Sequence, residues 1–149
     1  MDRKVVIIPT YNEKENIEAI VRKVFSLEGE YNVLIIDDGS PDGTAAIVKK
    51  VQTEFPERLF LIERSGKLGL GTAYLTGFKW ALENGYDYIF EMDADFSHNP
   101  EDLPRLYKAC AECGGVAIGS RYCDGISVVN WPIGRILMSY FASIYVKTV

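Results

Sequence analysis

The sequence contains one histidine, three cysteines and six prolines among its 149 residues. An odd number of cysteines argues against a disulfide framework and fits a reducing compartment. Cys110 and Cys113 form a CxxC pair, but we expect them near the C-terminal end of a helix, where the helix dipole disfavours a thiolate. With His98 as the only histidine, neither redox nor zinc chemistry is expected at this pair.

A long hydrophobic run and a cluster of basic residues are also missing. The N-terminus reaches only a short apolar stretch before Pro9, which fits neither a signal peptide nor a membrane span, so we expect a cytoplasmic chain. Sixteen basic and 21 acidic residues give a formal net charge of -5, which argues against a general nucleic-acid-binding protein. The length and the 48% hydrophobic content predict one globular domain over residues 1–149.

Two common phosphate-binding loops are absent as well. In the stretch GKLGLGTAYLTG, Tyr74 stands where a GxGxxG loop needs its third glycine, and Lys67 is not followed by Ser or Thr as in a Walker loop. A dinucleotide oxidoreductase and a P-loop enzyme are therefore disfavoured. The glycines fit either a flexible loop with a helix cap or a loop that gates a ligand.

Apolar runs alternate with helical patterns along the chain. The runs predict buried strands at Val5–Ile8, Val33–Ile36, Leu59–Ile62, Tyr88–Met92 and Val116–Ile118. Predicted helices run from an Asn12 cap to Leu27, over Thr44–Phe55, over Thr72–Asn84 with Leu75, Phe78 and Leu82 on the apolar side, and from an Asn99 cap to about Cys113. This alternation predicts an α/β sandwich with a mostly parallel central sheet.

Polar clusters follow four of the predicted strands, at the carboxyl ends where ligands bind in such sheets. They are PTYNE (Pro9–Glu13), DDGSPDGT (Asp37–Thr44), DAD (Asp93–Asp95) and GSRY (Gly119–Tyr122). In an extended chain, Asp93 and Asp95 point to the same side about 7 Å apart. Carboxylate oxygens select Mg²⁺ or Mn²⁺, which keep positions open for phosphate oxygens, so we expect a metal that holds a diphosphate. An ordinary turn or cap role for Asp95, and for DDGSPDGT, is the alternative.

Taken together, PTYNE, DDGSPDGT, GLGTAY with Gly77, MDADFSH with Pro100, and GSRY resemble the motifs of the family 2 glycosyltransferases. Their fold is GT-A, a Rossmann-like three-layer sandwich. The resemblance covers Val5 to about Arg135 and is strongest to the dolichol-phosphate and polyprenol-phosphate mannose synthases. It implies a metal-dependent, inverting transfer of a hexose, with mannose from GDP-mannose favoured, to a polyprenyl or dolichyl phosphate. A family 2 transferase acting on a cell-surface polysaccharide and a non-catalytic nucleotide-sugar-binding module remain the alternatives.

The resemblance also implies roles for individual residues. Those that would bind the nucleotide are Pro9, Tyr11, Glu13, Asp37 and Asp38, the last two through the base and ribose. Asp93 and Asp95 would form the DXD pair that holds Mg²⁺ or Mn²⁺, with Asp95 as the direct ligand. Arg121 would face the acceptor phosphate or the diphosphate. Ser97 stands where many relatives carry a further metal ligand, Gln, which puts that contact in doubt.

No catalytic base is implied. A polyprenyl phosphate, with a second pKa of about 6, is largely a dianion at neutral pH and can attack the anomeric carbon unaided. His98, beside a predicted helix cap, is therefore expected to be structural.

Residues 131–149 predict an amphipathic helix, with apolar residues at 136/137, 140/141 and 144/145. Its apolar part, Ile136–Val146, is far shorter than a membrane span. Two interpretations stay open. The helix either packs on the sheet or on another subunit, or it lies at the cytoplasmic face of a membrane and presents Arg135 to the lipid phosphate. Because family members continue beyond this point, we expect a C-terminally truncated catalytic domain.

Overall fold

The computed structural model describes residues 2–119 and 132–148. The chain divides into two units, Met1–Ala117 and Ile118–Val149. The first unit contains a parallel sheet with the helices α1 to α4, and the described part of the second forms one helix, α5 (Ile133–Thr148).

The sheet has four strands in the order β3 (Leu59–Glu63), β2 (Tyr31–Asp37), β1 (Lys4–Thr10) and β4 (Tyr88–Glu91). All neighbouring strands pair in parallel, and the register sets Thr10 opposite Asp37 and Asp37 opposite Glu63. Four of the five predicted strands are confirmed, with small shifts at their ends. Their carboxyl ends meet at one edge of the sheet.

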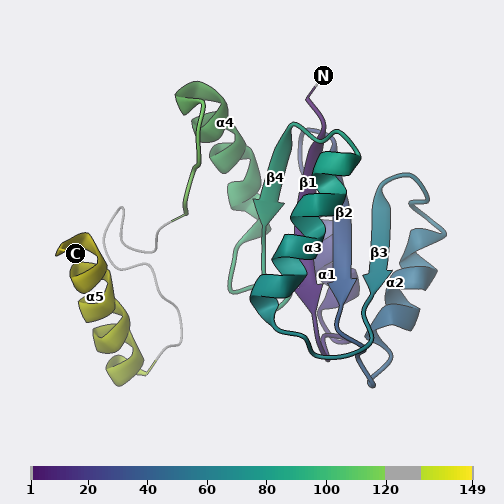
Figure 1. Ribbon diagram of the computed structural model, residues 1–149, viewed down its shortest axis with the longest axis horizontal. Helices are drawn as coiled ribbons and strands as arrows, with labels where there is room; N and C mark the ends of the chain where they lie inside the picture. Colours follow the sequence, from purple (N-terminus) through teal and green to yellow (C-terminus); the bar gives the residue numbers. More distant parts are fainter. Residues whose placement is uncertain (1, 120–131, 149) are drawn as a thin grey trace. The chain divides into compact units, whose positions relative to one another are not determined.

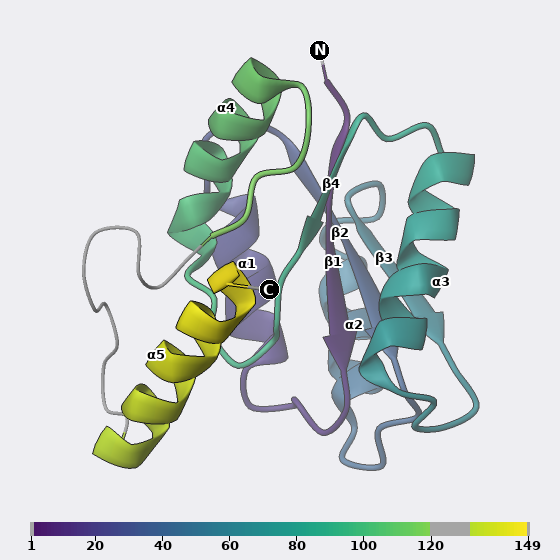
Figure 2. The same cartoon turned by 60° about the vertical axis from the view of Figure 1, so that its left-hand side comes forward.

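Helices cover both faces of this sheet (Figures 1 and 2). The helices α1 (Ile17–Phe25), α2 (Thr44–Gln52) and α4 (Leu103–Cys113) lie on one face, and α3 (Leu70–Glu83) lies on the other. Alternate residues of the buried part of β1 point to opposite layers, with Val6 and Ile8 in the α1 cluster and Ile7 in the α3 cluster. The predicted three-layer α/β sandwich is therefore confirmed.

The apolar side predicted for α3 is wrong for Leu75 and Leu82, while Phe78 is half-buried against the core. Leu75 and Leu82 are 59% and 69% exposed, whereas the buried residues of this helix are Ala73, Gly77 and Ala81. A Cβ on Gly77 would lie 2.7 Å from Cγ2 of Ile7, so the backbone of α3 approaches β1 too closely for a larger side chain. Both the predicted set of large apolar residues and the buried set of small residues recur at helical spacing. The close approach to β1 leaves room only for the small residues on the side of α3 that faces the sheet.

The fourth predicted helix begins as expected. The Asn99 side chain accepts a hydrogen bond from the Glu101 amide at 3.1 Å and caps a short 3₁₀ turn, η1 (Pro100–Asp102), which continues into α4. The predicted cap at Asn12 is wrong, since α1 begins at Ile17 with Asn16 before it. Asn12 instead has a φ of 61°, a left-handed conformation that asparagine tolerates, and its backbone amide donates to Ser40 Oγ at 3.0 Å.

The predicted strand at Val116–Ile118 does not form. None of the described strands pairs with this segment, and Val116 and Ile118 are 84% and 82% exposed. An isolated apolar run has no ladder to join, so hydrophobicity alone does not make it a strand.

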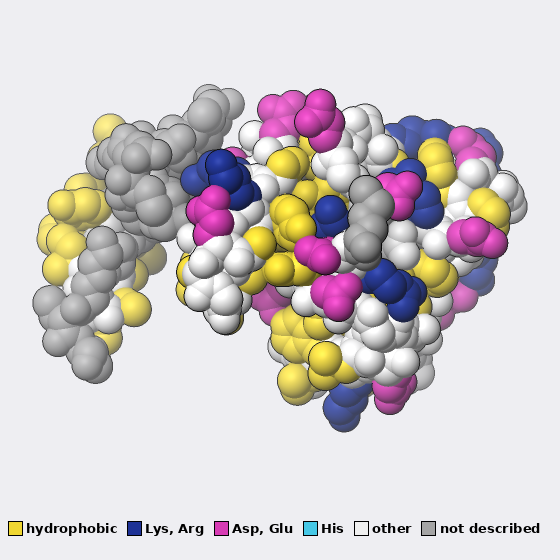
Figure 3. All heavy atoms as spheres, turned by 90° about the horizontal axis from the view of Figure 1, so that it is seen from above, with side chains coloured by type: hydrophobic (Ala, Val, Ile, Leu, Met, Phe, Trp, Pro, Cys, Tyr) yellow, Lys and Arg dark blue, Asp and Glu magenta, His cyan; other side chains and the backbone are white. Residues whose placement is uncertain are grey.

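The end of the first unit from which the N-terminus emerges carries charges of both signs side by side, as Figure 3 shows. A cavity of about 160 Å³ lies at this end, lined by Asp2, Arg3, Lys4, Glu30 and Asn32. It is at the amino ends of β1 and β2, away from the edge where ligands bind in parallel sheets.

Candidate functional site

Three of the four predicted polar clusters lie at the same edge of the sheet. β2 and β4 flank β1, so PTYNE, DDGSPDGT and DAD follow three adjacent strands. Arg121, from the fourth cluster, lies outside the described residues. The structure therefore brings together the clusters that the sequence assigned to the nucleotide and the metal.

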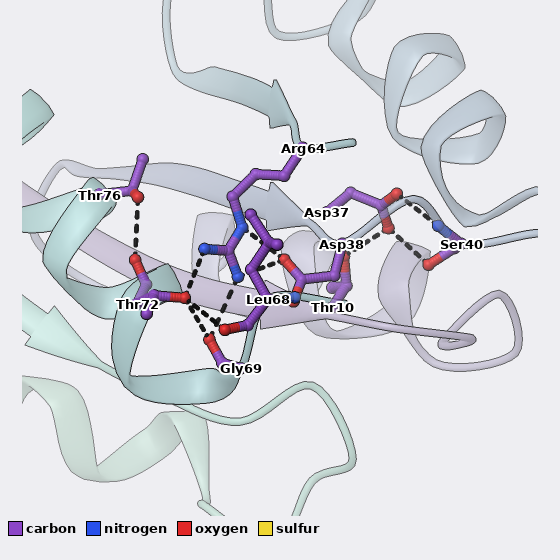
Figure 4. A network of polar contacts seen from close by, with 9 residues as sticks. All are labelled: Thr10, Asp37, Asp38, Ser40, Arg64, Leu68, Gly69, Thr72 and Thr76. Atoms are coloured by element: carbon purple, nitrogen blue, oxygen red, sulfur yellow. Dashed lines mark hydrogen bonds and ion pairs between the residues drawn. The ribbon is translucent and has the colours of Figure 1, made fainter. Parts of the chain in front are cut away.

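Asp37 at the end of β2 joins two of these loops (Figure 4). It is 1% exposed, and its Oδ1 accepts hydrogen bonds from Thr10 Oγ1 at 2.8 Å and Ser40 Oγ at 2.6 Å. Its Oδ2 accepts the Ser40 amide at 2.9 Å. These contacts fix the turn after β2 against the end of β1. This structural role was not predicted for Asp37, although an Asp three residues before a Ser is a common turn signal.

Asp38 is also buried, at 6% exposure, and it is paired with a cation. Its Oδ1 lies 2.5 Å from Nε of Arg64, and its Oδ2 accepts the Leu68 amide at 3.2 Å. The sequence did not predict a role for Arg64, although a basic residue directly after the third predicted strand is a signal for one.

A cavity of about 130 Å³ opens beside Asp38. Its lining consists of Pro9, Thr10, Tyr11, Asp38, Lys67, Gly69, Leu70 and Ala73. Three residues predicted to bind the nucleotide, Pro9, Tyr11 and Asp38, therefore meet at one cavity. Lys67 holds its ammonium 4.6 Å from the centre of the Tyr11 ring, a cation–π contact. Small-molecule sites usually measure roughly 300–1,000 Å³, so this cavity can hold part of a nucleotide sugar.

Glu13 lies apart from that cavity, in the segment between β1 and α1. Its carboxylate accepts a hydrogen bond from Asn16 Nδ2 at 3.2 Å, and its amide donates to Thr44 Oγ1 at 3.0 Å. Asp42 supports the same junction by accepting from Thr44 Oγ1 at 2.6 Å and from the Lys14 amide at 3.2 Å. Desolvation opposes ionisation of Asp42, but these hydrogen bonds outweigh it and lower its pKa below the usual value.

The extended geometry expected for Asp93 and Asp95 is wrong. β4 ends at Glu91, and Ala94 and Asp95 form a turn. Asp95 is exposed, and its Oδ1 accepts the Ser97 amide at 2.9 Å, the contact of an Asx turn. Hydrogen bonds from Ser97 lower the pKa of Asp95, which keeps this carboxylate ionised at neutral pH.

Asp93 is half-buried and is oriented by two neighbours. Its Oδ1 lies 3.4 Å from the hydroxyl of Tyr74, and its amide donates to His98 Nδ1 at 3.2 Å. Burial, together with the charges of Asp93 and Glu91, raises the pKa of Tyr74, so its hydroxyl stays protonated as a donor. His98 thus orders the loop after β4, in keeping with the structural role expected for it.

A metal at this loop would find at most two carboxylates among the residues that the structure describes. Within residues 2–119 and 132–148, no three His, Cys, Asp or Glu side chains are placed to hold a metal ion together. Mg²⁺ is commonly bound by one or two carboxylates, with phosphate oxygens and water at its other positions. Asp93 and Asp95 therefore fit a divalent ion that is shared with a diphosphate.

The helix α5 is confirmed at the C-terminal end, and Arg135 lies in its first turn, where the Arg135 amide donates to the Pro132 carbonyl at 2.9 Å. Several of its apolar side chains are exposed, including Leu137 at 50%, Met138 at 75% and Phe141 at 64%. Among the described residues, no helix has the length and apolar character needed to span a bilayer.

The sequence matches the family model described as Glycosyl transferase family 2 over residues 5–147. The chain belongs to glycosyltransferase family 2. Among curated relatives of this family 2 chain is a polyprenol monophosphomannose synthase from Mycolicibacterium smegmatis, 48% identical over 143 residues, which cover 96% of the chain and 54% of the relative. An undecaprenyl-phosphate mannosyltransferase from Micrococcus luteus is 44% identical, with 96% and 58% covered. A dolichol-phosphate mannosyltransferase from Pyrococcus furiosus is 40% identical, with 90% and 37% covered.

The chain thus spans about half the length of the first two of these relatives, at 54% and 58%. A solved mannosyltransferase from Pyrobaculum calidifontis, PcManGT, in complex with GDP-Man and Mn²⁺, superposes with a TM-score of 0.65 and 28% identity over 73% of the chain and 32% of that protein. TarS from S. aureus, at 24% identity and a TM-score of 0.61 over 74% of the chain and 32% of TarS, supports the fold alone. The predicted GT-A fold is confirmed.

Proposed function

We propose that this family 2 chain carries the donor site of a metal-dependent, inverting transferase, which moves mannose from GDP-mannose to a polyprenyl or dolichyl phosphate. The observation that carries the proposal is the identity of 40% to 48% with three relatives that are each named for mannosyl transfer to a lipid phosphate or for the product of that transfer. The geometry of the site supports this proposal, because the cavity and the carboxylates of Asp93 and Asp95 lie at the ends of adjacent strands.

In this proposal the donor enters at the cavity beside β1. Pro9, Tyr11 and Asp38 line the nucleoside end, while Asp93 and Asp95 lie after β4, on the other side of β1 from Asp38. A bound Mg²⁺ or Mn²⁺ would neutralise the diphosphate as it leaves. The chain contributes by holding both carboxylates in place, Asp93 through Tyr74 and His98, and Asp95 through Ser97. GDP-mannose is favoured as the donor because the PcManGT complex contains GDP-Man and Mn²⁺.

The acceptor supplies its own nucleophile. A polyprenyl phosphate is a dianion at neutral pH, so one direct displacement at the anomeric carbon inverts its configuration and needs no protein base. Arg121 and Arg135 are the cations assigned to the acceptor phosphate. His98 is therefore not required as a base, and its Nδ1 accepts a hydrogen bond from the backbone amide of Asp93.

The same proposal places α5 at the cytoplasmic face of the membrane, where the lipid acceptor lies. The exposed apolar side chains of Leu137, Met138 and Phe141 suit the boundary between headgroups and acyl chains. Pairing of α5 with a second copy of the chain would cover the same side chains, and a homo-oligomer is the alternative.

Calorimetric titration tests the donor. We expect GDP-mannose to bind in the presence of Mn²⁺ and to be released by EDTA, with UDP-glucose binding less tightly. Incubation with labelled GDP-mannose and either polyprenyl phosphate or a polysaccharide then separates the two acceptor classes, and label is expected in the lipid. Binding without transfer would favour a nucleotide-sugar-binding module, and binding of UDP-glucose alone would contradict the assigned donor.

A further inference from the structure

A network of polar contacts joins the ends of β2 and β3 to the start of α3 (Figure 4). At its centre is Arg64, directly after β3, with a side chain only 8% exposed. Besides its 2.5 Å contact with Asp38, Arg64 donates from Nη1 to Thr72 Oγ1 at 2.7 Å and from Nη2 to the Gly69 carbonyl at 3.2 Å. One guanidinium thus connects the end of β2, the loop 65–69 and the first turn of α3.

The Thr72 hydroxyl also holds the loop 65–69, since it donates to the Leu68 carbonyl at 3.0 Å and to the Gly69 carbonyl at 2.8 Å. Residues 67–70 are exposed, and a Cβ built on Gly66 or Gly69 would meet nothing within 4 Å. Gly69 has a φ of 99° and a ψ of 147°, a conformation that is essentially restricted to glycine, so the chain bends sharply there. The polar contacts to Arg64, Asp38 and Thr72, rather than apolar packing, therefore fix the position of this loop.

The same loop forms one wall of the 130 Å³ cavity. Lys67, Gly69 and Leu70 line it, and Lys67 lies over the ring of Tyr11 on the opposite side. A displacement of the loop would open this wall and separate Lys67 from Tyr11. Loss of Arg64 would also leave Asp38, whose side chain is 9% exposed, as a buried carboxylate without its cation.

We infer that Arg64 is a positioning residue for donor binding, which holds the loop 65–69 in place as a wall of the nucleotide-sugar cavity. This inference rests on the proposed function. In it Asp38 acts through Arg64 and the Leu68 amide, because its two oxygens already accept hydrogen bonds from these groups.

The main variant is Arg64→Lys, which keeps the positive charge for Asp38 but loses the fork that reaches Thr72 and Gly69. We expect faster amide hydrogen exchange over residues 65–72 of the free chain and a Kd for GDP-mannose with Mn²⁺ raised about tenfold, the scale of a lost charged hydrogen bond. The matched control is Arg58→Lys at the other end of β3, where Arg58 donates to the Tyr31 carbonyl at 3.0 Å. This control should leave both quantities unchanged.

A second pair of variants tests the contact itself. Thr72→Val removes the hydroxyl that accepts from Arg64 and donates to the Leu68 and Gly69 carbonyls, and Thr72→Ser keeps it. We expect the valine variant to show the exchange and affinity changes of Arg64→Lys and the serine variant to behave like the unmodified chain. A merely structural effect of side-chain size at residue 72 would not separate them in this way.

The outcomes distinguish this inference from the proposed function. If the unmodified chain binds neither GDP-mannose nor UDP-glucose, the proposed function fails, and the hydrogen-exchange measurement still decides whether Arg64 holds the loop. If the chain binds GDP-mannose and Arg64→Lys binds it equally tightly, the inference is wrong while the function stands. Unchanged exchange in Arg64→Lys, or equal changes in Arg58→Lys, would also overturn it.

Discussion

Replacing Gly77 by alanine should destabilise the protein, although alanine is the better helix former. Gly77 lies inside α3, where a glycine-to-alanine change alone gains about 1 kcal/mol. The new Cβ, however, would lie 2.7 Å from Cγ2, 2.8 Å from Cδ1 and 3.2 Å from Cγ1 of Ile7. Carbon atoms pack best at about 3.5–4.0 Å, so either the helix or Ile7 must move by most of an ångström.

Ile7 has little freedom to move. It is 0% exposed, and its β-branched side chain has a stiff first torsion. Overpacking of such a core costs about 1–3 kcal/mol, and the middle of that range less the helical gain leaves a net loss of about 1 kcal/mol. Urea titration should then show a midpoint lowered by about 0.5 M, for a slope of about 2 kcal/mol per molar.

Two comparisons sharpen the measurement. Gly71→Ala changes another glycine of the same helix, where a Cβ would meet nothing within 4 Å, and should keep or raise the midpoint. Adding Ile7→Val to Gly77→Ala removes the Cδ1 contact, so the double variant should lose less stability than the sum of the two single changes. A Gly77→Ala protein as stable as the unmodified chain would refute the close approach of α3 to β1.

Three further predictions concern the site and the second unit. Asp95→Asn should abolish the gain in GDP-mannose affinity that Mn²⁺ gives in calorimetry. The control Asp87→Asn, at a residue just before β4, should keep that gain. Retained sugar transfer by Asp95→Asn would contradict the metal role. The depressed pKa of Asp42 implies a contribution to stability that is present above its unfolded pKa of about 4 and is lost as the pH falls through the folded pKa. Asp42→Asn should therefore lower the urea midpoint at pH 7 but much less at about pH 3. Equal losses at both pH values would show that the carboxylate charge is not involved. Replacing Leu137 and Phe141 together by glutamate should reduce co-sedimentation with anionic liposomes, and unchanged co-sedimentation would favour the subunit contact.

The sequence was sufficient to predict the layers of the fold because burial on both faces leaves a continuous apolar pattern. Val5–Ile8 and Val33–Ile36 are such runs, and all eight residues are fully buried. The edge that binds ligands followed from the rule for parallel sheets, and the motifs identified the family. These features depend on residue type and order along one strand, which a single sequence contains.

The errors have a different origin. The inner side of α3 depends on how closely that helix approaches Ile7, and the pairing of Arg64 with Asp38 depends on two strands being neighbours. Asp95 was expected in an extended chain, but a local hydrogen bond to the Ser97 amide turns the backbone instead. Each of these features is a contact that depends on the distance between two groups in the folded chain, and that distance cannot be derived from a single sequence.

Burial also distinguishes two pairs of aspartates at this edge, which have different tasks. Asp37 and Asp38 are 1% and 6% exposed, and donors inside the protein occupy their oxygens, as a buried carboxylate requires. The Asp93 side chain is 40% exposed, and the exposed Asp95 stays ionised. Charge that the protein leaves facing solvent at a ligand-binding edge attracts a cation, whereas charge already neutralised by Arg64 does not. We therefore expect removal of the metal to weaken the diphosphate contact after β4 while the loop held by Arg64 keeps its position.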